Sequence, residues 1–77
     1  MNFVEAMELL RAVSAFRTKS SEKLPKFRLY DSQTEGCTLH AKTQLITEDY
    51  RNYLEEIVKS RNLKIRESEG YLIIYGL

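Results

Sequence analysis

Hydrophobic residues recur along this chain in two spacings, one typical of helices and one typical of strands. In residues 47–60 the apolar positions fall on one face of a helix, namely Tyr50, Tyr53, Leu54, Ile57 and Val58. Thr47 is suited to cap this helix, and Glu48 and Asp49 place negative charge where it complements the helix dipole. The pattern predicts an amphipathic helix over residues 47–60.

The start of the chain shows the same helical spacing. Asn2, followed three residues later by Glu5, has the form of an N-cap with a reciprocating acid. The apolar stripe that follows is broad and comprises Phe3, Val4, Ala6, Met7, Leu9, Leu10, Val13 and Phe16. We therefore predict a first helix over residues 3–16, followed by a linker-like stretch that Pro25 ends by favouring extended geometry in the preceding residue.

Four shorter segments have the character of strands. Residues 26–30 and 37–42 alternate apolar and polar side chains around the turn formers of 31–36, which predicts a hairpin. Residues 63–66 and 71–75 predict a second hairpin, since Gly70 can supply a positive φ in the turn between them. Asn62 suits the left-handed residue that ends the preceding helix.

The predicted fold class is therefore α+β, with the order α-β-β-α-β-β in a single small domain over residues 1–77. We expect a four-stranded, mainly antiparallel sheet with both helices packed on one face. The pattern does not determine the order of the strands within the sheet.

Composition agrees with a small folded domain, because 43% of the 77 residues are hydrophobic and 30% are charged. A chain of this length buries only about 60–65% of its unfolded surface, so dimerisation would add stability. Cys37 is the only cysteine, which excludes an intramolecular disulfide and favours a reducing, cytoplasmic setting. The charges of Glu5, Glu8 and Arg11 argue against a signal peptide or a membrane span at the start of the chain.

The formal net charge of +1 hides an uneven distribution. Between Arg11 and Arg28, six basic residues accompany the single acid Glu22. From Leu29 onward, the sequence contains six basic and eight acidic residues. The basic character therefore belongs to one neighbourhood of the sequence.

The two-residue period of the strands assigns their side chains to two faces of the sheet. The face toward the helices is expected to hold Phe27, Leu29, Cys37, Leu39, Ala41, Leu63, Ile65, Leu72 and Ile74. The opposite face, called the outer face below, is expected to hold Arg28, Tyr30, Thr38, His40, Lys42, Lys64, Arg66, Tyr71, Ile73 and Tyr75. This second set mixes basic and aromatic residues and contains no acid, although such residues are also common on any solvated sheet face.

No catalytic motif stands out. Cys37 and His40 are three residues apart, so on a strand they point to opposite faces and cannot act as a thiolate–imidazole pair. The neighbouring acids Glu48 and Asp49 diverge on a helix and lack a third ligand for a metal ion. The chain's three glycines do not form a nucleotide-binding loop. We expect no enzymatic activity, no metal, no cofactor and no small-molecule substrate.

Two hypotheses of function remain. The first is a small intracellular module that binds nucleic acid through stacking and charge; its expected contacts are Arg17, Lys19, Lys23, Arg28, Tyr30, His40, Lys42, Lys64, Arg66, Tyr71 and Tyr75. The second is an adaptor or homodimerising regulatory protein, of the kind that mobile elements encode. Its interface would be the apolar side chains of the last strand, Tyr71, Ile73 and Tyr75.

Overall fold

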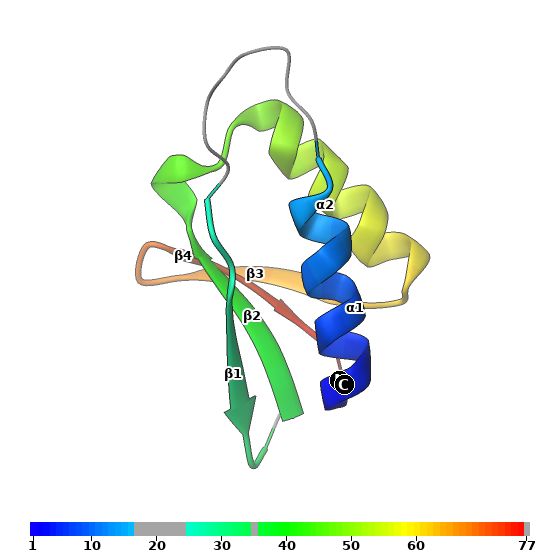
Figure 1. Cartoon of the computed structure of the whole chain (residues 1–77). Helices are drawn as coiled ribbons and strands as arrows, with labels where there is room; N and C mark the ends of the chain where they lie inside the picture. Colours follow the sequence, from blue (N-terminus) through cyan, green and yellow to red (C-terminus); the bar gives the residue numbers. More distant parts are fainter. Residues whose placement is uncertain (17–24, 35, 77) are drawn as a thin grey trace.

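The computed structural model describes residues 1–16, 25–34 and 36–76 (Figure 1). In chain order its elements are α1 (Phe3–Ser14), β1 (Arg28–Ser32), β2 (Gly36–Lys42), the short 3-10 helix η1 (Thr43–Leu45), α2 (Glu48–Ser60), β3 (Lys64–Ser68) and β4 (Tyr71–Tyr75). The α+β class and the α-β-β-α-β-β order are confirmed. Only η1 has no counterpart in the sequence prediction.

The sheet has four strands in the order β1-β2-β4-β3, and every neighbouring pair is antiparallel. The two hairpins predicted from the sequence are the pairs β1–β2 and β3–β4. They join through β2 and β4, where Leu39 lies opposite Ile74 and Lys42 lies opposite Tyr71. This central pairing brings the strand that precedes α2 beside the last strand of the chain.

Both helices begin at the predicted caps. The Asn2 side chain accepts a hydrogen bond from the Glu5 backbone N–H at 2.8 Å and donates one to the Glu5 carboxylate at 2.7 Å. The Tyr50 backbone N–H donates to the Thr47 hydroxyl at 3.2 Å. The two caps therefore satisfy backbone donors that the first helical turns leave free.

The chain leaves α2 and turns from β3 to β4 through left-handed residues. Asn62 has φ 58°, and the Leu63 N–H donates to the Val58 carbonyl at 2.8 Å, which closes the end of α2. Glu69 and Gly70 have φ 51° and 83° and form a two-residue hairpin turn. Glu69 is the unexpected member, because a side chain at positive φ is uncommon.

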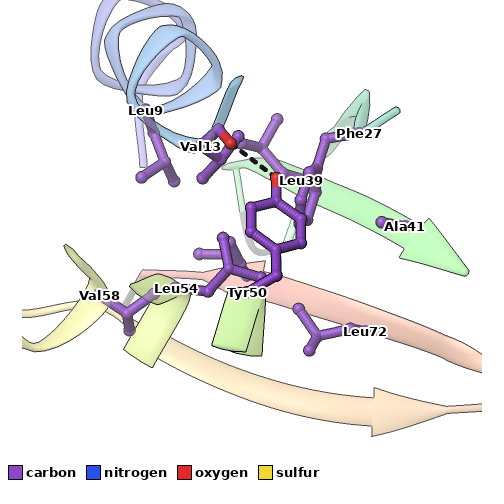
Figure 2. Close-up of a cluster of buried hydrophobic side chains, with 10 residues drawn as sticks. Leu9, Val13, Phe27, Leu39, Ala41, Tyr50, Leu54, Val58 and Leu72 are labelled. Atoms are coloured by element: carbon purple, nitrogen blue, oxygen red, sulfur yellow. Dashed lines mark hydrogen bonds between the residues drawn. The ribbon is translucent and has the colours of Figure 1, made fainter. Parts of the chain in front are cut away.

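The hydrophobic core lies between the helices and one face of the sheet (Figure 2). It contains Leu9, Val13, Phe27, Leu39, Ala41, Tyr50, Leu54, Val58, Leu72 and Ile74. Leu29, Leu63 and Ile65 are half-buried against it. Because both helices contribute to one cluster with the residues assigned to the inner face, they cover the same side of the sheet.

Tyr50 crosses the core from α2 to the end of α1. Its hydroxyl donates to the Val13 carbonyl at 2.6 Å (Figure 2). The Tyr53 hydroxyl donates to the Ala12 carbonyl at 2.7 Å. These carbonyls belong to the last turn of α1, where intrahelical partners run out. The helix ends at Ser14, two residues before the predicted end, and the Phe16 ring then packs on Tyr50 with centroids 5.2 Å apart.

Part of the broad apolar stripe predicted for α1 is exposed. Phe3, Val4 and Met7 are 61%, 65% and 40% exposed, whereas Ala6, Leu9 and Val13 are fully buried. The stripe was wider than the strip of sheet available to it, because α2 takes the adjacent place over the sheet. The first turns of α1 therefore keep an apolar patch in contact with solvent.

Candidate nucleic-acid interface

No described helix or strand packs over the outer face of the sheet. Its side chains form rows across the strands. Arg28 lies opposite His40, His40 opposite Ile73, and Ile73 opposite Arg66. Directly opposed residues on one face have Cβ atoms about 4.5–5.5 Å apart, so each row is a contiguous strip. The register therefore brings together basic residues that lie almost forty positions apart in sequence.

Acidic residues of the strands lie on the other side of the sheet. Glu67 is opposite Leu72, and Asp31 is opposite Cys37, both of which are inner-face positions. Glu67 forms an ion pair with Arg51 of α2, which agrees with its place on the helix side of the sheet. The hydrogen bond to Glu67 also raises the pKa of the Arg51 guanidinium. Among the described strand residues the outer face therefore has basic side chains without acidic ones.

A hollow of about 540 Å³ lies at the β1–β2 side of the outer face. We call it the basic hollow, and it is lined by Pro25, Lys26, Arg28, Tyr30, His40, Ala41, Lys42, Leu45 and Tyr71. Tyr30, Leu45 and Tyr71 are 47%, 54% and 40% exposed, so their apolar surfaces face solvent. None of the described lining residues is acidic. The hollow thus combines positive charge with accessible flat and apolar surface.

The turn between β3 and β4 holds η1 in place beside the basic hollow. The Thr43 backbone N–H and the Thr43 hydroxyl both donate to the Gly70 carbonyl, each at 2.9 Å. This double contact joins the chain after β2 to the hairpin turn before β4. Leu45 at the end of η1 and Tyr71 directly after Gly70 both line the basic hollow beside this contact.

Two of the outer-face tyrosines already have ring partners. The centres of the Tyr30 and His40 rings lie 4.4 Å apart. The His40 Nε2 atom lies 2.9 Å from the Thr38 hydroxyl oxygen. The Arg66 guanidinium carbon lies 4.8 Å from the centre of the Tyr75 ring, which is a cation–π contact. The outer face is therefore partly ordered by contacts among its own side chains.

Two smaller side chains of the outer face, Thr38 and Ile73, have little solvent exposure. Thr38 is 3% exposed and Ile73 is 6% exposed, although no described helix or strand lies over them. Ile73 is the central member of the alternative interface of Tyr71, Ile73 and Tyr75. Of the three, Tyr71 and Tyr75 offer most of the accessible surface.

The structure brings together only part of the predicted site. Arg28, Tyr30, His40, Lys42 and Tyr71 line the basic hollow, while Lys64, Arg66 and Tyr75 lie on the β3 half of the outer face. Arg17, Lys19 and Lys23 lie outside the described residues.

Four lining residues were missed by sequence reasoning, namely Pro25, Lys26, Ala41 and Leu45. Lys26 shares the alternation of Arg28 and could have been found from it. Leu45 follows no periodic pattern, because the single turn η1 positions it. The hollow therefore depends on a segment for which the sequence carried no signal.

Other candidate chemistry does not assemble. Cys37 is buried on the inner side while His40 lies on the outer face, as their spacing predicted. In the part of the chain that the structure describes, no group of three His, Cys, Asp or Glu residues could hold a metal ion. Within that same part, no helix has the length and apolar character needed to cross a membrane. Comparison with protein-family models, curated proteins and solved structures finds no match for this chain.

Proposed function

We propose that this protein is a non-catalytic module that binds nucleic acid through its outer face. The observation that carries the proposal is the basic hollow, where Lys26, Arg28 and Lys42 accompany exposed tyrosines and none of the described lining residues is acidic. Nucleic acids offer phosphates to the cations and flat bases to the aromatic rings. The cellular setting proposed with it is the cytoplasm.

Charge complementarity supports an anionic partner. None of the ion pairs found among the described residues includes Lys26, Arg28 or Lys42. The acids of the described strands, Asp31 and Glu67, lie at inner-face positions of the register, on the helix side of the sheet. A ligand phosphate would therefore meet cations that no described carboxylate neutralises.

The alternative proposal is self-association through Tyr71, Ile73 and Tyr75. An interface strong enough for a stable dimer buries about 800 Å² on each partner. Ile73 adds little to that area because it is 6% exposed in the single chain. Sedimentation velocity over a dilution series tests this proposal, since a folded monomer at low micromolar concentration would contradict it.

Fluorescence anisotropy with labelled RNA and DNA oligonucleotides of mixed sequence tests the nucleic-acid proposal. Arg28→Glu with Lys42→Glu reverses two charges at the basic hollow and should abolish most of the binding. Each lost phosphate contact should also lower the slope of log K against log salt by about 0.7 for single strands. Affinity of the unaltered protein should fall steeply with salt.

A matched control makes the same change of charge on the helices. Arg11→Glu with Lys59→Glu alters two exposed cations that do not lie on the sheet. This variant should keep most of the affinity, because only its long-range charge has changed. Equal losses in the two variants, or absence of binding at low salt, would contradict the proposal.

A further inference from the structure

We infer that the nucleic acid is single-stranded and that it places one unpaired base on the Tyr71 ring in the basic hollow, with its phosphates at Arg28 and Lys42. This inference rests on the proposed function and narrows it to one half of the outer face. The argument depends on which ring is accessible, on the size of the hollow and on the cations around it.

Tyr71 differs from the other two tyrosines of the outer face. Tyr30 packs against His40, and Tyr75 lies under the Arg66 guanidinium. Tyr71 is 40% exposed and takes part in none of the ring contacts found among the described residues. Arg66 already occupies one face of the Tyr75 ring, whereas none of these contacts occupies the Tyr71 ring.

The size of the hollow fits one nucleotide. Its volume of about 540 Å³ lies within the roughly 300–1,000 Å³ of ordinary small-ligand sites. A base in a duplex is stacked on its neighbours and presents only its edges in the grooves. Stacking on a protein ring requires an unpaired base, which favours a single strand.

Two cations lie on the strands to one side of Tyr71. Lys42 of the neighbouring strand β2 lies directly opposite Tyr71 in the register, and Arg28 of the next strand, β1, lies opposite His40, two residues before Lys42. A guanidinium binds a phosphate through two parallel hydrogen bonds, while an ammonium acts as a point charge. The backbone of the strand would therefore run across β2 while its base turns toward Tyr71.

The test compares Tyr71→Ala with the matched variant Tyr75→Ala, using labelled oligouridine, oligothymidine and a blunt DNA duplex in anisotropy titrations. Loss of one stacked base should weaken single-strand binding about fivefold to 150-fold in Tyr71→Ala. Tyr75→Ala should change it far less, and Tyr71→Phe should retain most of the affinity because it keeps the ring. The RNA and DNA arms show which sugar the hollow accepts. Circular dichroism of Tyr71→Ala establishes that the variant is folded.

The outcomes separate this inference from the proposed function. Single-strand binding that depends on Tyr71 and exceeds duplex binding supports the inference. Binding in which Tyr75→Ala costs as much as Tyr71→Ala, or in which the duplex binds equally well, overturns the inference and leaves the proposed function standing. Absence of binding to every oligonucleotide contradicts both.

Discussion

Replacing Tyr50 by phenylalanine removes a single hydroxyl that joins the two helices. The hydroxyl donates to the Val13 carbonyl at 2.6 Å, and the Tyr50 side chain is 1% exposed. Without it, a buried carbonyl loses its partner, and an unsatisfied buried acceptor costs about 1–3 kcal/mol. We expect Tyr50→Phe to lower the free energy of unfolding by that amount at neutral pH.

The same residue gives the stability a distinctive pH dependence. Burial, with a smaller contribution from Tyr53, raises the pKa of Tyr50 from 10.0 to about 12. The unfolded chain therefore loses this proton at a lower pH than the folded protein does. The stabilising contribution is complete below pH 10 and is lost as pH rises toward 12, in total about 2.7 kcal/mol at ~1.36 kcal/mol for each pKa unit.

Urea denaturation of the protein and of Tyr50→Phe at several pH values measures this effect. The advantage of the unaltered protein should shrink by about 1.4 kcal/mol by pH 11, because phenylalanine has no proton to lose. Tyr53→Phe is the matched control. The Ala12 carbonyl, which accepts from the Tyr53 hydroxyl, also accepts from the Ala15 N–H at 3.2 Å. Tyr53→Phe should therefore lower the free energy of unfolding by only about 0.5–1.5 kcal/mol. A difference between the unaltered protein and Tyr50→Phe that stays constant up to pH 11 would refute the reasoning.

Three further predictions concern stability and accessibility. Gly70→Ala should cost about 1 kcal/mol in urea denaturation through its φ of 83° alone, since no described atom lies within 4 Å of the added Cβ. Gly36→Ala should cost more, because its added Cβ would lie 2.8 Å from the Met1 carbonyl oxygen; an equal cost would contradict this account. Thr47→Ala should cost about 1 kcal/mol in the same assay through loss of the α2 cap, and no measurable cost would argue against that contact. The Cys37 thiol, 5% exposed, should react with a thiol reagent only as the protein opens, so fast labelling of the folded state would contradict its burial.

Local chemistry explains why the sequence predicted most of the elements. The Asn2 and Thr47 caps, the left-handed Asn62 and the turn at Gly70 each act within a few residues, so their signals are short and readable. The alternation of the strands likewise assigned Leu39 and Ile74 to the core without knowledge of the strand order. These features depend on near neighbours in the chain.

The remaining features depend on residues distant in sequence. The pairing of β2 with β4 sets the strand order, and no local pattern encodes it. The exposure of Phe3 follows from where α2 lies over the sheet, and the low exposure of Ile73 belongs to a face without described helices or strands. The basic hollow needed Leu45 in η1, which the Thr43–Gly70 contact positions. The sequence therefore predicted the members of the outer face but not the division of that face into two halves.

A backbone-amide NMR titration with a single-stranded oligonucleotide, at low and at moderate salt, tests the central claim most directly. We expect shifts around Tyr30, Lys42 and Tyr71 that weaken as salt rises, with α1 unchanged. Absence of shifts, or shifts centred on the exposed patch of Phe3 and Val4, would contradict binding at the outer face.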